Sequence, residues 1–343
     1  MLRYAIVGTN WLSHIYYHAI EAAGDRVAAV CSRSRERAAE LGQGKALVYT
    51  ELDEMLKNPD IDVVYLCIPN VLHADAALRC LRAGKHVLCE KPMAISAEDA
   101  VRMVETAEQM GVLLTVGHQS RFSPAAQALY RQLREGAFGS LYFARASMVR
   151  RMGIPTWGHF FDPAVQGGGC LIDLGTHALD LALWLLNDFS PAYCCAGIFR
   201  GPGDSPTPAN RWGTWDPAML RTETGAFGQV VLQSGTVLSL DISWALHVPE
   251  DREETVTLCG TAAGAELFPG GYTISGTQGA RLVTTRYQMP EEEQSANRAQ
   301  LEDFLSSIRE HRLPLVTAAQ SLVVMQILSG LYRSARELRP VEF

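Results

Sequence analysis

The feature that most constrains the fold is a regular alternation of short apolar segments with amphipathic segments over the first 120 residues. The apolar segments predict strands, at 4–8, 26–31, 46–49, 63–68, 86–89 and 112–116. The segments between them predict helices, at 11–23, 34–41, 51–57, 71–82 and 97–110. Apolar strands joined by helices are typical of a parallel sheet covered on both faces. This part of the chain is therefore predicted to be α/β, with a doubly wound sheet of the kind that binds nucleotides.

After residue 120 the pattern changes to strands joined by hairpin-like turns. Strands are predicted at 141–151, 193–199, 225–232, 236–244, 254–259 and 281–287, and helices at 123–135, 170–186, 297–310 and 317–337. This order predicts an α+β domain with a large, mostly antiparallel sheet. We expect a Rossmann dinucleotide-binding domain at 1–120 and a substrate and oligomerisation domain at 121–343, whose last helix can pack back on the first.

Composition excludes several classes of protein. The 343 residues are 48% hydrophobic and 20% charged, which is ordinary for a packed chain of two domains. The net charge is −7 without a basic run, and no apolar stretch is long enough to span a bilayer, so neither nucleic acid nor a membrane is an expected partner. The eight cysteines lack C-x-x-C spacing, and the N-terminus lacks a signal-like segment, so we expect reduced thiols in the cytoplasm. No metal-ligand pattern is present, and no metal is expected.

The first predicted strand runs directly into a turn and a helix, at Gly8-Thr9-Asn10-Trp11-Leu12-Ser13. A sharp turn at a glycine before a helix N-terminus is the context of a dinucleotide-binding fingerprint, in which helix N–H groups face a pyrophosphate. The match is degenerate, because Asn10 and Ser13 stand where further glycines are usual. An ordinary strand–helix turn remains the alternative.

The second predicted strand ends without the acidic residue that would hold the ribose hydroxyls of NAD. Ser32 and Arg33 stand there instead, and they could bind a 2′-phosphate. NADP is therefore slightly favoured over NAD as the cofactor. The alternative is that these residues are solvated charges at the start of the next helix.

More specific motifs follow along the chain. They are Pro69-Asn70-x-x-His73, Glu90-Lys91-Pro92, His118-x-x-Arg121-Phe122, Gly167-Gly168-Gly169-x-x-x-Asp173-x-Gly175-x-His177 and Gly260-Thr261. Together with the glycine turn, they resemble the Gfo/Idh/MocA family of NAD(P)-dependent oxidoreductases over the whole chain. The resemblance implies the two-domain fold described above, and an activity on hydroxyls of sugars, polyols and their derivatives.

Lys91 is the strongest candidate for a catalytic cation. The chain has only four lysines against 26 arginines, and Lys91 follows a predicted strand, where ligands bind in open α/β sheets. Its ammonium could hydrogen-bond a reacting hydroxyl and favour the alkoxide. Glu90 is expected to position it, and the resemblance implies a cis bond between Lys91 and Pro92. A surface Lys–Glu pair is the alternative.

Asp173 and His177 are four residues apart in a predicted helix, so both side chains should emerge on one face. We predict hydride transfer between a carbinol carbon and nicotinamide, with His177 as general base, Asp173 orienting it or a substrate hydroxyl, and Lys91 polarising the oxygen. The sequence leaves open an exchange of base roles between Lys91 and His177. A capping aspartate beside a core histidine is the alternative.

The remaining candidates are contact residues. Ile68 ends a predicted strand, and Pro69, Asn70 and His73 follow it. All four are expected at the cofactor, with Glu90 and Lys91. His118, Arg121, Arg150, Trp157 and His159 are expected at the substrate, since aromatic rings stack on sugars and arginine binds anionic groups. A packed loop with solvated arginines is the alternative for the last group.

Three functions fit these residues. The first is an NAD(P)-dependent dehydrogenase or reductase acting on a secondary hydroxyl of a sugar, polyol, inositol or glycoside. The second is a redox-neutral glycosidase or lyase, which oxidises its substrate transiently and recycles the cofactor. The third is a non-catalytic NAD(P)-sensing regulatory protein. A homodimer or homotetramer through the second sheet is expected, because an exposed sheet needs cover.

Overall fold

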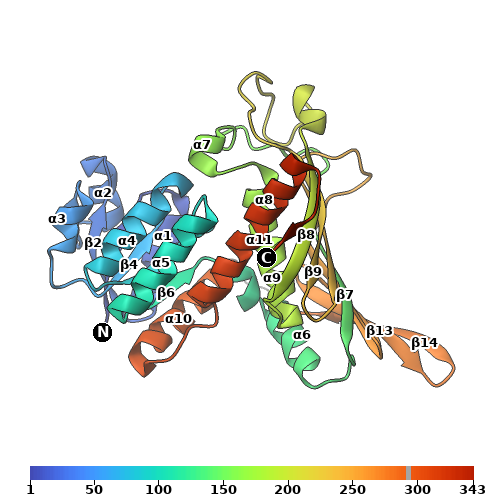
Figure 1. The fold of residues 1–343 in the computed structure, drawn as a ribbon. Helices are drawn as coiled ribbons and strands as arrows, with labels where there is room; N and C mark the ends of the chain where they lie inside the picture. Colours follow the sequence, from blue (N-terminus) through green and yellow to red (C-terminus); the bar gives the residue numbers. More distant parts are fainter. Residues whose placement is uncertain (291–294) are drawn as a thin grey trace. The chain divides into compact units, whose positions relative to one another are not determined.

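The computed structural model describes residues 1–290 and 295–343 (Figure 1). Contacts divide them into two compact units. Of the described residues, the first unit contains 1–119 and 295–322, and the second contains 120–290 and 323–343. The chain thus returns to the first unit after completing most of the second.

The first unit is built on a six-stranded sheet in the order β3-β2-β1-β4-β5-β6. Its strands are β1 (Arg3–Val7), β2 (Arg26–Cys31), β3 (Leu47–Tyr49), β4 (Val63–Leu66), β5 (His86–Cys89) and β6 (Leu114–Val116). Every neighbouring pair is parallel, which confirms the predicted doubly wound sheet. The strand order reverses between β1 and β4, and ligands of such sheets bind at the carboxyl ends of the strands at that point.

Helices connect these strands, close to the predicted positions. They are α1 (Trp11–Ala22), α2 (Arg35–Gly42), α3 (Leu52–Leu56), α4 (His73–Arg82) and α5 (Ala97–Met110), with a 3₁₀ turn, η1, at Asn70–Leu72. Helix α10 (Ser295–Glu310) joins this unit as well. Its residues Leu301, Phe304, Leu305 and Ile308 are buried in the same core as Tyr4 and Ile6 of β1. The spacing of these apolar residues gives α10 one continuous stripe, and the stripe lies in the core of the first unit.

The second unit contains a nine-stranded sheet in the order β14-β13-β12-β11-β7-β10-β9-β8-β15. Its strands are β7 (Leu141–Val149), β8 (Pro191–Phe199), β9 (Gly225–Leu232), β10 (Val237–Ser243), β11 (Arg252–Gly260), β12 (Ala263–Phe268), β13 (Gly271–Gln278), β14 (Arg281–Gln288) and β15 (Val341–Glu342). Among the described strands of this sheet, only β7 and β10 pair in parallel, which confirms the predicted, mostly antiparallel sheet. Strands β12, β13 and β15 were not predicted.

The helices of the second unit are α6 (Pro124–Arg134), α7 (Pro163–Gln166), α8 (Cys170–Asp173) and α9 (Gly175–Leu186), and α11 (Ala318–Glu337) lies mostly in this unit. Short 3₁₀ turns are η2 (Gln119–Phe122) and η3 (Gly201–Asp204). Helix α9 packs across β7, β10 and β11, where it buries one face of the sheet, including Ala144, Ala146 and Leu240. On the opposite face, cross-strand neighbours such as Phe143 and Val237 stay partly exposed.

The long predicted helix at 170–186 is two helices. Helix α8 ends at Asp173 and α9 begins at Gly175, and the segment Pro163–Asp173 meets α9 at an angle of 46°. The hydroxyl of Thr176 bonds to the carbonyl of Ile172 across this break, at 2.6 Å. Among the described residues, no single helix has the length and apolarity to cross a membrane, and only this bent pair passes that test when its parts are combined.

Candidate functional site

The first unit holds an open cavity of about 740 Å³ at the carboxyl ends of β1, β2 and β4. Six of the predicted cofactor residues line it: Gly8, Thr9, Asn10, Ser32, Arg33 and Ile68. The structure therefore brings together the glycine turn and the end of the second strand, at the switch point of the sheet.

Gly8 can only be a glycine. Its φ is +106°, a conformation that residues with a Cβ rarely adopt. A Cβ there would lie 2.0 Å from the carbonyl oxygen of Cys67. The missing side chain lets the turn after β1 approach the end of β4, and this close approach shapes one wall of the cavity.

Asn10 caps helix α1 with its own side chain. Its Oδ1 accepts hydrogen bonds from the backbone N–H groups of Leu12 at 3.0 Å and Ser13 at 3.1 Å. The Cys67 thiol also donates to Oδ1, at 2.9 Å. These two N–H groups therefore bond to the cap, and the expected contact between this helix and a pyrophosphate stays a prediction. The side chain of Trp11 lies outside the cavity lining and is 69% exposed.

The end of β2 supplies cationic and hydroxyl groups to the cavity. Ser32 Oγ lies 3.4 Å from Thr9 Oγ1, and Arg33 is exposed at the rim. Two further arginines line the cavity that no sequence motif indicated, Arg37 and Arg79. Arg37 follows the helix cap Ser34 by three residues, so the spacing at the start of α2 could have signalled it.

His73 is fully buried between two loops. Its Nδ1 lies 2.7 Å from the carbonyl of Pro92, and its Nε2 lies 2.9 Å from the carbonyl of Ile68. Burial lowers the pKa of the ring, although both carbonyls oppose this shift. The imidazole thus ties the loop after β4 to the loop after β5, while the adjacent Pro69 and Asn70 are partly exposed.

The loop after β5 carries Lys91, which is half-buried, and the Lys91–Pro92 bond is cis, as the resemblance implies. The preceding Glu90 accepts a hydrogen bond from the Tyr65 hydroxyl at 2.7 Å. Burial raises the pKa of Glu90, against the opposing effects of Tyr65 and the Lys91 charge. A Cβ on Gly117 would lie 2.8 Å from the same carboxylate. Glu90 is therefore held on two sides beside the Lys91 backbone.

The second unit supplies the other predicted catalytic groups. In the stretch 168–186, all of which the structure describes, every residue is buried except Asp173 and His177. Asp173 Oδ2 accepts a hydrogen bond from the indole N–H of Trp244 at 3.0 Å. An otherwise enclosed segment therefore leaves accessible only the two side chains that can exchange protons or bind hydroxyls.

The glycines before this segment allow a close approach to Glu223. A Cβ on Gly169 would lie 2.1 Å from the Glu223 carbonyl oxygen. The Glu223 carboxylate accepts hydrogen bonds from the N–H groups of Gly169 and Leu171 at 2.9 and 3.0 Å, and from the Tyr332 hydroxyl at 2.8 Å. Burial raises the pKa of this carboxyl group, and these donors oppose the shift. Glu223 therefore fixes the start of the helix that ends at Asp173.

Aromatic rings extend from Asp173. Trp244 packs edge-on against Phe160, Phe160 against Trp157, and Trp157 against Trp212, with centroids 5.9, 5.8 and 4.8 Å apart. We refer to these four residues as the aromatic cluster. Trp157 is 50% exposed, and its neighbour His159 is exposed as well.

Arg121 has a different setting from the one the sequence suggested. Its guanidinium is 0% exposed and donates to both carboxylate oxygens of Asp180, at 2.8 and 2.6 Å. His118 is also buried. Among the described residues, no group of three or more histidine, cysteine, aspartate or glutamate side chains could hold a metal ion.

The strand order and the Gly8 turn define a dinucleotide-binding class of protein. The profile of an oxidoreductase family with an NAD-binding Rossmann fold matches residues 2–118, and the Gfo/Idh/MocA C-terminal domain matches residues 126–266. The chain belongs to the Gfo/Idh/MocA family of oxidoreductases.

Named relatives match over nearly the whole chain. D-glucoside 3-dehydrogenase of Escherichia coli is 32% identical over 99% of this chain and 97% of its own length. 1,5-Anhydro-D-fructose reductase of Ensifer adhaerens is 29% identical over 96% of this chain and 95% of its own length. The crystal structure of aldose-aldose oxidoreductase from Caulobacter crescentus, complexed with glycerol, superposes with a TM-score of 0.82 at 25% identity, covering 100% of this chain and 99% of that one.

Proposed function

We propose that the protein transfers a hydride between NAD(P) and a secondary hydroxyl of a sugar, polyol, inositol or glycoside. The first unit would bind the dinucleotide and the second unit the substrate. The observation that carries this proposal is the selective exposure of Asp173 and His177 in a segment that is otherwise buried. Family membership and the names of the two relatives above support the substrate class.

The proposed chemistry assigns one task to each side chain. A bound nicotinamide would supply the acceptor for the hydride of the carbinol carbon. His177 takes the hydroxyl proton, so that the carbon–oxygen single bond becomes a carbonyl. Lys91 donates a hydrogen bond to the same oxygen while it carries negative charge. Asp173 orients His177 or a neighbouring substrate hydroxyl, with its own carboxylate held by Trp244.

The proposed contact set follows the observed surroundings of each residue. The cavity in the first unit fits a dinucleotide, because Gly8 leaves room for close backbone approach and Thr9, Ser32 and Arg33 surround it. Arg150, Trp157 and His159 remain proposed substrate contacts. We leave out His73, whose ring nitrogens face two carbonyls, and Arg121, whose guanidinium is paired with Asp180.

A screen of sugars, polyols, inositols and methyl glycosides, each with NAD and with NADP, tests this proposal. We expect reduced nucleotide to form with at least one substrate, and kcat/KM to be higher with NADP, because Ser32 and Arg33 replace the usual ribose-binding acid. Cleavage of a glycosidic bond without net formation of reduced nucleotide would favour the redox-neutral glycosidase. Tight nucleotide binding without any conversion would contradict the catalytic proposal.

We also propose a homodimer or homotetramer through the partly exposed face of the nine-stranded sheet. Phe143, Val237, Val231 and Tyr193 are successive cross-strand neighbours on this face. Sedimentation should give two or four times the chain mass of 37.6 kDa. Phe143→Glu should shift the mass toward the monomer, whereas Tyr142→Glu, on the opposite side of the same strand, should not. A monomeric wild-type protein at micromolar concentration would contradict this proposal.

A further inference from the structure

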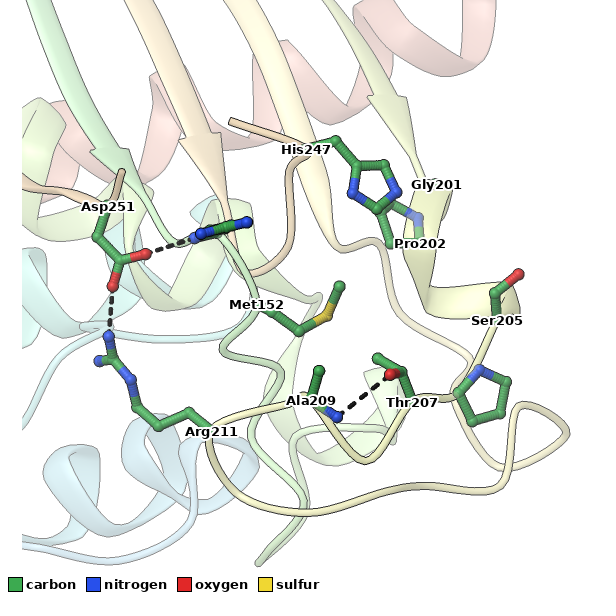
Figure 2. Close-up of a pocket in the computed structure, with 11 residues that line it drawn as sticks. Met152, Gly201, Pro202, Ser205, Thr207, Ala209, Arg211, His247 and Asp251 are labelled. Carbon is green, nitrogen blue, oxygen red and sulfur yellow. Dashed lines mark hydrogen bonds and ion pairs between the residues drawn. The ribbon is translucent and has the colours of Figure 1, made fainter. Parts of the chain in front are cut away.

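A second cavity, of about 1220 Å³, lies within the second unit among loops that the proposed chemistry does not use. It is lined by the residues after β7, the loop that contains η3, and the connection between β10 and β11. Figure 2 shows Arg211 and Asp251 on one side, Pro202 and His247 on the other, and Met152 between them. The cavity is open, and its volume lies above the usual range of about 300–1,000 Å³ for small-molecule sites.

A chain of contacts through residues outside the lining connects this cavity to Asp173. The aromatic cluster runs from Trp244, which bonds to Asp173, to Trp212, the neighbour of the cavity residue Arg211. A second connection follows the backbone. Met152 pairs with Ala245, the residue after Trp244, and the Met152 carbonyl accepts a hydrogen bond from the N–H of Arg211 at 3.1 Å. The cavity and the candidate catalytic carboxylate are therefore two ends of one packed region.

Arg150 lies between these two ends. Its guanidinium stacks on Trp212, with the central carbon 5.1 Å from the ring centroid, and Arg211 stacks on the same ring at 5.5 Å. Burial lowers the pKa of Arg150, while the charges of Asp173 and Asp251 oppose that shift. The Arg150 charge thus interacts both with the candidate catalytic carboxylate and with the carboxylate of the cavity.

The cavity lining combines fixed polar groups with apolar surfaces. Asp251 forms an ion pair with Arg211 and accepts the N–H of Arg151 at 2.6 Å, which holds both residues at the wall. Polar groups of His247, Ser205 and Thr207 surround the same space, as do the apolar side chains of Met152, Pro202 and Pro206. Hydrogen-bonding groups beside flat apolar surfaces suit a hydroxylated ring, whose edges are polar and whose faces are apolar.

We propose that this cavity is a subsite for the second sugar ring of a glycoside whose first ring is oxidised beside Asp173. The inference rests on the proposed function and narrows its substrate class from sugars in general to disaccharide-like glycosides. Trp157 and Trp212 would contact the glycosidic linkage, and Arg211 would hydrogen-bond hydroxyls of the second ring.

The test is equilibrium binding by titration calorimetry, in the presence of the nucleotide, with methyl α-D-glucoside, methyl β-D-glucoside, methyl α-D-maltoside and methyl β-D-cellobioside. We expect a disaccharide probe to bind about tenfold more tightly than the monosaccharide of the same linkage. Arg211→Ala should remove most of this difference while leaving monosaccharide binding within about twofold, because it deletes donors only at the second ring. Arg200→Ala is the matched control, since Arg200 pairs with Asp204 in the same loop and does not line the cavity.

The outcomes separate this inference from the proposed function. Equal affinities for mono- and disaccharide probes in the wild-type protein would overturn the subsite. A disaccharide preference that Arg211→Ala leaves unchanged would overturn it as well. Binding that depends on Arg211, without reduced nucleotide in the screen, would support the subsite and contradict the hydride transfer. Reduced nucleotide in the screen, without disaccharide binding that depends on Arg211, would support the hydride transfer and overturn the subsite.

Discussion

Lys91→Met should lower kcat by roughly 10²–10³-fold with the substrate found in the screen, because the variant lacks the proposed donor to the developing alkoxide. Methionine keeps most of the length and apolar volume of the lysine stem, so the loop after β5 should hold its place. Since the ammonium would act mainly when charge develops on the oxygen, KM should change much less than kcat. Steady-state kinetics with saturating nucleotide measures both constants.

Lys57→Met is the matched control, because Lys57 is an exposed lysine that pairs with Glu54 on the surface of the same unit. Its kcat should stay within about twofold of wild type. Nucleotide affinity and the thermal unfolding midpoint should remain near wild type in both variants, which separates loss of chemistry from loss of structure. A Lys91→Met enzyme that keeps a third or more of the wild-type kcat would rule out the proposed role.

The first sheet could be predicted because each of its elements carries its own signal. Helix α5 occupies the predicted residues 97–110, with a serine cap before it and Gly111 in a left-handed conformation after it. In the second sheet, β12 and β13 escaped prediction because glycines such as Gly264, Gly271 and Gly276 interrupt their alternation. These strands are defined by pairing with β11 and β14 rather than by their own composition.

The residues of the candidate site also divide into those with a local sequence signal and those without one. Gly8, Lys91, Asp173 and His177 stand in local motifs, so the sequence pointed to them directly. Trp244 and Glu223 carry no such signal, because their contacts join residues that are 71 and 54 positions apart. Only the folded sheet, which places the ends of β9 and β10 beside α8, shows that these two residues hold the segment containing Asp173.

Arg121 shows why a motif does not fix a role. The His118-x-x-Arg121-Phe122 segment suggested a substrate contact, yet the guanidinium is fully buried against Asp180 on α9, 59 residues away. From the local sequence, an arginine after a strand fits a ligand and an internal ion pair equally well. The partner that decides between them lies on another element.

Asp180→Ala should lower the free energy of unfolding by about 3–5 kcal/mol, because it leaves the Arg121 charge buried without its carboxylate. Denaturant titration measures this loss. Asp204→Ala, which removes an exposed partner of Arg200, should cost less than about 1 kcal/mol. The double variant Arg121→Met/Asp180→Leu should recover most of the lost stability, because it removes both charges and fills the same volume.

The double variant also tests the role of Arg121. If Arg121 only supports the fold, the double variant should regain kcat and KM values close to wild type along with its stability. A folded double variant whose KM rises tenfold or more would instead return Arg121 to the substrate contacts. A loss below about 1 kcal/mol in Asp180→Ala would contradict this prediction, because it would mean that the Arg121 guanidinium, which is 0% exposed, does not depend on the Asp180 carboxylate.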